Sequence, residues 1–582
     1  MTPDSIRRSR SGWLWPALLC CAAVVLASCA PSGPASRQAT QSGDQKTSAP
    51  KTLRMGMIAG SEPTENIPLG SGGTGGGEHP FMLHAGLTIY DAQGTLQPHV
   101  AQRVPTIENG DWKVMPDGQM EVTWKLRPAV KWHDGTPLAA SDFVLGLQVA
   151  RDPEMPIRRP RALSFIADAR APDASTVVVR WKQLYSFANV SGAMDATLPA
   201  LPRHLLADLS RGDKHELVNA PYWTREFVGL GPYRINDWVQ ASQLDLRAFD
   251  QYFLGRPKID RVIVRYFGDA NVVVASLLSG DIDMTPMGAM KAEQLVTVKN
   301  AWAPTGIGTA YAQVGGARNY RFQYRDPTAP WAQDVRVRQA LIHMLDRQTI
   351  ADTLVYGLTK AADTLPPPED PIYQALEQKG LSRYPYDLNR AQQLLATAGW
   401  TRGVDGVYRS ASGQLFDLEV RTSGKTDNVR EGQALAGEWK SAGINATPFA
   451  FADNASNKDE LKAVYPGLLG WPLDFSPEAM QGWISTQIPT QGTAWKGSNF
   501  GGYVNPRFDS LFDEHLVALE TPKRQGLFAD LLKILADDAV SVSLYYDTST
   551  YTVAYRKGIR GVTMAPSLQQ INAWNIQTWE MD

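Results

Sequence analysis

The 582-residue chain has few cysteines, and all three stand near its N-terminus, at Cys20, Cys21 and Cys29. The sequence beyond residue 29 has none, which excludes a disulfide framework, a thiol nucleophile and a cysteine metal site there. The chain also lacks an excess of charge of one sign, since 57 Lys and Arg stand against 59 Asp and Glu, a formal net charge of −2. This balance argues against a nucleic-acid-binding protein.

Long apolar runs are scarce too. The run from Trp13 to Ala27 is too short to span a bilayer comfortably, and it follows a cluster of three arginines. This arrangement predicts a secretory signal peptide over residues 1–28. Leu26-Ala27-Ser28-Cys29 resembles a lipobox, so we expect cleavage before Cys29 and attachment of lipid to its sulfur, with an ordinary signal peptide cut nearby as the alternative. Two or three acyl chains would anchor the protein stably to a membrane.

The composition changes after the signal. Residues 29–50 are rich in Ser, Pro, Ala, Gln and Thr and poor in apolar side chains, so we expect a flexible tether. Ordered structure should begin at Lys51, because Leu53, Met55 and Met57 alternate with other residues as in a strand. The remaining length is too great for one core, and a hydrophobic fraction of 43% is typical of globular domains.

The most informative stretch spans residues 123–144. Around its start, Val122, Trp124 and Leu126 alternate with polar residues, which is the period of a strand with one buried face. His133-Asp134-Gly135-Thr136-Pro137 predicts a turn, because Asp-Gly favours a positive φ and proline ends a strand ladder.

Capping residues precede several stretches with helical periodicity. The expected caps are Ser141 or Asp142 before Phe143, Asp334, Asp387 with Gly399 as the stop, and Thr521 followed by Pro522. The expected buried stripes are Val337, Ala340, Leu341, Met344 and Leu345 in one helix, and Leu527, Leu531 and Leu535 in another. Paired glycines at Gly229 and Gly231, before Pro232, suit either a hinge between domains or an ordinary loop into a strand, and both interpretations stay open.

Together these motifs resemble the family 5 extracellular solute-binding proteins, which serve ABC importers of peptides, nickel and related solutes. The resemblance is carried mainly by residues 123–144, by Val335-Arg336-Val337-Arg338-Gln339-Ala340-Leu341 with Asp346-Arg347, and by residues 499–509. It extends from about residue 52 to Trp579. One departure is residues 540–544, where the family usually places a proline.

The resemblance implies an α/β fold of the type II periplasmic-binding-protein kind, with two α/β lobes, an extra inserted domain and a ligand cleft between the lobes. Lobe I would combine residues 51–85, 228–305 and 541–582. The extra inserted domain would be 86–227, and lobe II would be 306–540. Closure of the lobes would bury the ligand.

The resemblance also implies a ligand contact. Asp474 matches a carboxylate that pairs with the α-ammonium of the ligand in peptide-binding members, although Pro472, Leu473 and Phe475 make the match partial. A solvent-facing helix cap is the alternative role. Trp471 could stack on the ligand or belong to the core. Lys458 or Lys462 could meet a ligand carboxylate, but nothing in the sequence fixes either position.

The function implied is a lipid-anchored, monomeric binding protein at the periplasmic or extracellular face of the cell envelope, which captures a peptide and delivers it to ABC permease subunits. Other ligands in the same fold would be an oligosaccharide, an opine, a nickel complex or haem, and a sensor that presents its ligand to a membrane receptor stays open. A secreted hydrolase lacks supporting motifs. We expect no cofactor. We also expect no metal, because the eight histidines lack metal-ligand spacing, although a site built from distant histidines stays open; they are His79, His84, His99, His133, His204, His215, His343 and His515.

Overall fold

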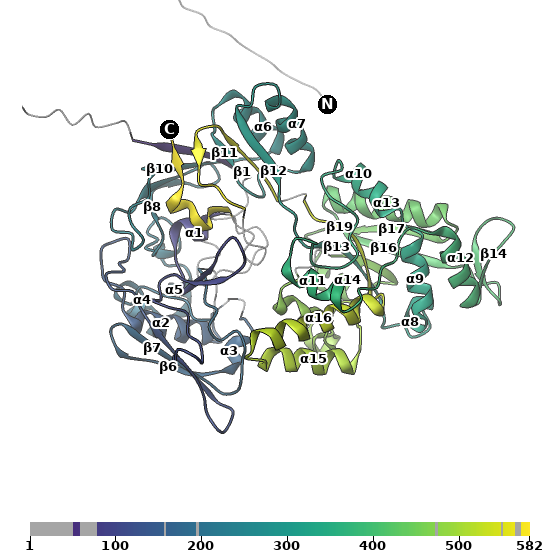
Figure 1. Cartoon of the computed structure of the whole chain (residues 1–582), viewed down its shortest axis with the longest axis horizontal. Helices are drawn as coiled ribbons and strands as arrows, with labels where there is room; N and C mark the ends of the chain where they lie inside the picture. The colour runs from purple at the N-terminus through teal and green to yellow at the C-terminus, as the bar shows by residue number, and fades with distance from the viewer. Residues whose placement is uncertain are drawn as a thin grey trace, which may run out of the picture. The chain divides into compact units, whose positions relative to one another are not determined.

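The computed structural model describes residues 50–58, 78–155, 157, 159–193, 197–471, 475–548, 551–564 and 572–582. The signal peptide, the lipid attachment at Cys29, the tether up to residue 49 and the ligand residue Asp474 lie outside these residues. Three main sheets and their helices make up the described chain (Figure 1).

A seven-stranded sheet gathers segments from both halves of the chain. Its strand order is β12-β20-β11-β1-β10-β9-β8, and β1 runs parallel to β10 and β11. The bounds are β1 Thr52–Ile58, β8 Tyr233–Val239, β9 Gln243–Ala248, β10 Arg261–Phe267, β11 Met284–Thr285, β12 Gly308–Ala312 and β20 Thr552–Arg556. Helices α6 (Ala270–Ser279) and α7 (Ala292–Trp302) pack on this sheet. The expected strand at Leu53, Met55 and Met57 is confirmed as β1, and all three side chains are buried.

A four-stranded antiparallel sheet, ordered β4-β5-β7-β6, stands between β1 and β8 in the chain. The strands are β4 Trp112–Val114, β5 Met120–Lys125, β6 Ile166–Asp173 and β7 Thr176–Trp181, after a hairpin of β2 Thr88–Tyr90 and β3 Leu96–Pro98. The helices of this part are α1 His79–Leu83, α2 Ala140–Arg151, α3 Ala162–Phe165, α4 Arg203–Arg211 and α5 Lys214–Val218. The alternation seen in the sequence is confirmed in β5, where Val122 and Trp124 are buried.

The start of α2 differs from its prediction. The helix begins at Ala140, so neither Ser141 nor Asp142 is the N-cap residue. Asp142 still satisfies a free N–H group, because its carboxylate accepts a hydrogen bond from the N–H of Ala139 at 3.0 Å. Asp142 is the third residue of the helix, and its carboxylate reaches back to the backbone of the N-cap residue, Ala139. The sequence pattern does not distinguish this role from that of an N-cap residue.

A five-stranded mixed sheet forms the centre of the second half, in the order β17-β16-β18-β13-β19. Its strands are β13 Ala317–Phe322, β16 Asp417–Ser423, β17 Asn445–Phe451, β18 Gly467–Gly470 and β19 Ser541–Tyr546. Around it lie α8 Pro330–Gln333, α9 Val335–His343, α10 Arg347–Leu354, α11 Pro371–Gln378, α12 Leu388–Thr397, the hairpin β14 Trp400–Arg402 and β15 Tyr408–Ser410, α13 Thr426–Ser441, α14 Lys458–Ala463, α15 Pro506–Val517 and α16 Thr521–Asp537.

Two of the expected helix caps in this half are confirmed. Asp334 accepts the N–H of Arg336 at 2.8 Å at the start of α9, and Asp387 accepts the N–H of Arg390 at 2.9 Å at the start of α12. The third is wrong by one residue, since Glu520 and not Thr521 precedes α16. Both predicted stripes are buried.

The connections between the two large sheets run through two crossing segments. One joins β12 to β13 over residues 313–316, and the other leaves β19 towards β20. They are hydrogen-bonded to each other: the N–H of Gly315 donates to the carbonyl oxygen of Asp547 at 2.8 Å, and the N–H of Gln313 donates to that of Tyr551 at 2.8 Å. The domain boundaries stay a prediction, but β12 pairs in the sheet assigned to lobe I, and β19 pairs in the sheet assigned to lobe II.

The paired glycines at 229 and 231 have a packing role. A Cβ at Gly229 would lie 1.9 Å from the carbonyl oxygen of Leu83, and one at Gly231 would lie 2.4 Å from that of Met82. The turn is also held by His133, whose Nδ1 accepts the N–H of Gly229 at 3.1 Å and whose Nε2 donates to the carbonyl oxygen of Gly231 at 3.0 Å. Close backbone approach therefore explains both glycines without hinge motion.

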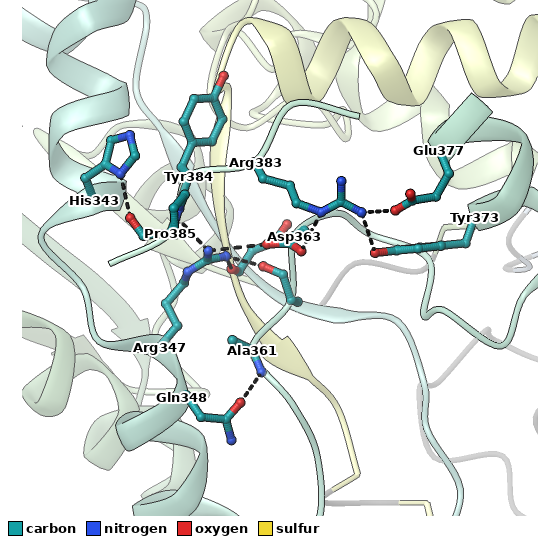
Figure 2. A network of polar contacts seen from close by, with 12 residues as sticks. His343, Arg347, Gln348, Ala361, Asp363, Tyr373, Glu377, Arg383, Tyr384 and Pro385 are labelled. Atoms are coloured by element: carbon teal, nitrogen blue, oxygen red, sulfur yellow. Dashed lines mark hydrogen bonds and ion pairs between the residues drawn. The ribbon is translucent and has the colours of Figure 1, made fainter. Parts of the chain in front are cut away.

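Arg347, the first residue of α10 and part of the matched motif, binds the chain beside β19, the outermost strand of the five-stranded sheet (Figure 2). Its buried guanidinium donates to the carbonyl oxygens of Ala362, Ser543 at 3.0 Å and Tyr384 at 2.8 Å. Asp363 lies 3.5 Å from it and is shared with Arg383. Because Ala362 itself donates to the carbonyl oxygen of Leu544, residues around 362 cover the edge of β19.

Candidate functional site

Trp471 lies where strands of the five-stranded sheet end, immediately after the C-terminal end of the central strand β18. We call this side of the sheet, where β16 and β18 end, the candidate-site edge. Ser423 ends the neighbouring parallel strand β16 at the same level. In open α/β sheets, ligands bind beyond the carboxyl ends of parallel strands. This edge is therefore the place where the fold itself favours a ligand, and it includes one of the two residues that the sequence analysis selected.

A buried ion pair stands at this edge. Arg318, at the start of β13, places Nε 3.1 Å and Nη2 2.6 Å from the two carboxylate oxygens of Glu431 on α13. The side chains are 12% and 2% exposed. Burial opposes the charge of Arg318, but the Glu431 carboxylate outweighs this effect and raises the pKa of Arg318. The pair therefore fixes α13 against β13 at the edge where β16 and β18 end.

Polar groups around the pair complete a network. The hydroxyl of Tyr320 donates to Glu431 at 3.1 Å, and Asn428 accepts from Arg318 at 2.7 Å and donates to Ser423 at 2.7 Å. Asp547, in a crossing segment, lies 3.9 Å from Arg318. The network thus connects the end of β16, the start of α13 and one of the two crossings between the sheets.

Trp471 contacts both an aromatic ring and a cation. Its backbone N–H donates to the carbonyl oxygen of Asn319 at 3.1 Å, its ring meets that of Phe500 edge-on at 5.8 Å, and the Nζ of Lys462 lies 5.2 Å from its ring centre. The ring is half-buried. Trp471 therefore takes part in packing, and its remaining exposed surface leaves room for contact with a ligand. Its expected partner at position 474 lies outside the described residues.

The two lysines considered from the sequence differ in their surroundings. Lys462 is 14% exposed, approaches Phe500 as well as Trp471, and pairs with Asp459 at 2.7 Å. Lys458 instead donates to the carbonyl oxygen of Asp453 at 3.0 Å, on the exposed surface. Of the two, only Lys462 contacts Trp471 among the interactions of the described residues.

A buried arginine next to this cluster was missed by the sequence analysis. Arg321 on β13 stands 4.6 Å from the ring of Trp483 and 5.6 Å from that of Phe500. Its Nη1 donates to the carbonyl oxygens of Gly482 at 3.2 Å and Ser498 at 2.9 Å. Burial lowers the pKa of Arg321 to about 10. A lone arginine in a strand resembles a solvent-facing residue in sequence, so no pattern predicted this position.

The histidines do not form a metal centre in the described part of the chain. No group of three or more His, Cys, Asp or Glu side chains there could hold a metal ion. His84, His99 and His133 are buried, and burial lowers the pKa of each, to about 3, 4 and 4. In the same described residues, no helix is long and apolar enough to cross a membrane.

A cavity of about 530 Å³ opens at the other edge of the five-stranded sheet. Its lining includes Trp331, Trp400 and Asp417, the last of which begins β16. Neither Trp471 nor Lys462 lines it, so this cavity is separate from the candidate site.

Comparison with known proteins supports the resemblance seen in the sequence. Residues 96–487 match the model of the bacterial extracellular solute-binding proteins, family 5 Middle. The oligopeptide-binding protein AppA of Bacillus subtilis is 25% identical over 591 residues, which cover 99% of this chain and 99% of AppA.

Solved structures share the fold. The ABC transporter substrate-binding protein CtaP of Listeria monocytogenes superposes with a TM-score of 0.69 at 18% identity, over 91% of this chain and 99% of CtaP. NikZ of Campylobacter jejuni, in complex with Ni(L-His), superposes with a TM-score of 0.68 at 20% identity, over 91% of this chain and 100% of NikZ. The fold of the periplasmic binding proteins of this type is thus confirmed, and the chain belongs to the bacterial extracellular solute-binding proteins, family 5.

Proposed function

We propose that this protein is the substrate-binding component of an ABC importer and that its ligand is a peptide. The observation that carries the proposal is the likeness to the oligopeptide-binding protein AppA over 99% of both chains, with a half-buried Trp471 at the sheet edge that favours ligands. The ligand is captured between the two lobes, and closure buries it. Such closure needs a ligand that contacts the closed form better than the open one.

Asp474 supplies the negative charge for the peptide's α-ammonium in this proposal, and Trp471 supplies a flat apolar surface beside it. A charge-assisted hydrogen bond of this kind contributes roughly 1.5–3 kcal/mol. Lys462, which approaches Trp471 at 5.2 Å, provides positive charge for a carboxylate of the ligand.

The protein is lipid-anchored through Cys29 and acts as a monomer at the periplasmic or extracellular face of the cell envelope, where it delivers the ligand to permease subunits. The lipobox-like sequence before Cys29 and the polar tether after it support this arrangement. Replacing Cys29 by Ser removes the acylated sulfur, so the proposal requires the C29S protein to leave the membrane fraction.

A thermal-shift screen tests the peptide ligand. Short peptides should raise the melting temperature in a concentration-dependent way, because a ligand that binds only the folded state stabilises it by mass action. Acetylation of the peptide's amino terminus, or the variant Asp474→Ala, should weaken binding about 10- to 100-fold, in line with the loss of one charge-assisted bond.

The matched control is Asp208→Ala, which removes a carboxylate that is 98% exposed on α4 and should leave binding unchanged. Equal stabilisation by free and acetylated peptides would contradict the role of Asp474. Stabilisation by sugars or by a nickel–histidine complex alone would contradict the peptide ligand, and turnover of a screened compound would contradict a pure binding function.

A further inference from the structure

Two parts of the chain that are far apart in sequence meet at a small buried contact. One part is residues 185–188, which follow strand β7, and the other is the helical hairpin of α15 and α16. The N–H of Ser186 donates to the carbonyl oxygen of Leu516 at 2.7 Å, and its hydroxyl donates to that of His515 at 3.2 Å. Ser186 is 2% exposed and His515 is 1% exposed.

Two aromatic rings and one cation lie near His515. Its ring centre lies 5.6 Å from that of Phe187 and 5.5 Å from that of Phe528. Its Nδ1 donates to the carbonyl oxygen of Arg524 at 3.0 Å, and the guanidinium of Arg524 lies 5.4 Å from the ring of Phe187. Phe187 thus contacts both an imidazole and a guanidinium of the opposite hairpin.

The topology shows why this contact matters. Residues 185–188 belong to the chain between β1 and β8 of the seven-stranded sheet, whereas α15 and α16 stand between β18 and β19 of the five-stranded sheet. In the described chain these sheets are also linked through the crossing segments at 313–316 and at 547, 548 and 551, and through the ion pair of Lys291, next to α7, with Asp427 on α13 at 2.6 Å. A contact that joins the same two bodies at a further place restricts their relative motion.

One polar atom of this contact, on His515, lacks a hydrogen-bond partner. Its Nε2 is buried and has no hydrogen-bond partner among the described residues. A buried polar atom without a partner is costly, and the cost disappears when the atom reaches water. This cost lowers the stability of the closed contact relative to an open form in which Nε2 is hydrated.

We propose that residues 185–188 and the α15–α16 hairpin form a releasable clasp, that ligand binding favours its closed form, and that protonation of His515 opens it. Only the effect of ligand rests on the proposed function. Opening separates Phe187 from His515 and Arg524 and exposes Nε2 to solvent, while the crossing segments keep the two sheets connected.

The direction of the pH effect follows from linkage. In the closed clasp, burial lowers the pKa of His515 to about 4; the hydrogen bond to the carbonyl oxygen of Arg524 opposes this shift, and the charge of Arg524 adds to it. In the open clasp the ring is exposed, and an unperturbed histidine has a pKa of about 6.5. The closed form is thus favoured at neutral pH and loses stability as the pH falls below about 6.5, and the open fraction should rise about 30-fold between pH 7.5 and pH 5.

The neighbouring charges do not reverse this expectation. Arg524 on α16 is a fixed cation that disfavours a second positive charge on His515, and Tyr90 is the titratable neighbour that acts on Arg524. On α15, Asp513 pairs with Arg161 at 3.8 Å, and both side chains are largely exposed. Glu514 is the other carboxylate next to His515 in sequence and stands on the exposed side of α15.

Hydrogen exchange of the full chain, followed by mass spectrometry at pH 7.5 and pH 5 and corrected for intrinsic rates, tests the clasp. Exchange in residues 184–188 should become about 30-fold faster at pH 5, while residues 120–125 of β5 stay protected and thereby report that the domain has not unfolded. Phe187→Ala should exchange fast at both pH values, and His515→Gln should abolish the pH dependence.

The matched control is His215→Gln, the same change at an exposed histidine on α5, which should behave as wild type. Equal exchange of residues 184–188 at both pH values in wild type, with Phe187→Ala also unchanged, would overturn the clasp, as would pH dependence retained in His515→Gln. This measurement needs no ligand, so it stands even if no peptide binds. A peptide that stabilises wild type should slow exchange in residues 184–188, and no such slowing would refute the coupling to ligand.

Discussion

At Gly231 a single hydrogen atom in place of a side chain decides how two segments pack. The backbone of residues 82–84 approaches so closely that a Cβ would meet three backbone atoms within 2.6 Å. The turn that contains Gly231 also receives His133, so the packing of this one residue connects α1, the turn at 133–137 and the start of β8.

Gly231→Ala should therefore destabilise the protein by roughly 3 kcal/mol or more, because backbone cannot move aside as a flexible side chain can. Urea denaturation should show a lower midpoint with an unchanged slope. Gly268→Ala is the matched control, since a Cβ at Gly268 would find nothing within 4 Å, and its effect should stay near zero. Equal midpoints for the two variants would contradict the close approach.

At the scale of elements, a buried ion pair joins α13 to β13 near the candidate site. Arg318 and Glu431 are both buried, and Glu431 is shared with Tyr320. Removing Glu431 leaves the buried charge of Arg318 without its closest partner, with Asp547 next nearest at 3.9 Å. Breaking a buried ion pair in this way typically costs about 3–5 kcal/mol.

Glu431→Ala should accordingly lower the free energy of unfolding by about 3–5 kcal/mol and also weaken ligand binding, because Asn428 and Ser423 lose their arrangement. Glu438→Ala, two turns further along α13, is the control: burial and then the charge of Asp346 raise the pKa of Glu438, while a hydrogen bond from the backbone of Asp346 lowers it. This variant removes that hydrogen bond but no buried ion pair, so its loss of stability should be much smaller. Calorimetry of both variants measures the difference. A loss below about 1 kcal/mol for Glu431→Ala would show that the pair is dispensable.

The elements also show what sequence can and cannot predict. The strand at Val122 and Trp124 and the helix capped by Asp334 depend on neighbours within a few residues, so local periodicity and capping predicted both. The pair of Arg318 with Glu431 joins residues 113 positions apart, and the contact of Ser186 with His515 joins residues 329 apart. Such contacts depend on topology, which local patterns do not contain. For the same reason, the sequence did not predict that β12 pairs in the seven-stranded sheet and β19 in the five-stranded sheet.

At the scale of the whole molecule, buried histidines couple the fold to pH. Burial lowers the pKa of five of them to about 3 or 4; they are His79, His84, His99, His133 and His515. In the unfolded chain each would titrate near about 6.5. Below that pH the unfolded state binds more protons than the folded state, so folding becomes less favourable as the pH falls towards about 4.

One buried carboxyl acts in the opposite direction. Glu78 accepts the N–H of Ala573 at 2.5 Å, yet burial raises its pKa from 4.5 to about 7. The pKa of Glu78 in the folded state lies above its unfolded value. Its contribution to the free energy of unfolding is therefore fully present below about pH 4.5 and is lost as the pH rises through about 7. A single group of this kind offsets only part of the effect of five histidines between pH 5 and pH 7.

The free energy of unfolding should therefore fall by a few kcal/mol between pH 7.5 and pH 5, as an order of magnitude. Urea denaturation at both pH values measures it, and Glu78→Gln should steepen the fall by removing the opposing carboxyl. The test separates this global effect from the clasp, because His515→Gln removes only one of the five histidines and leaves most of the fall in place. Equal stability of the wild-type protein at the two pH values would contradict the low pKa values that burial gives these five histidines.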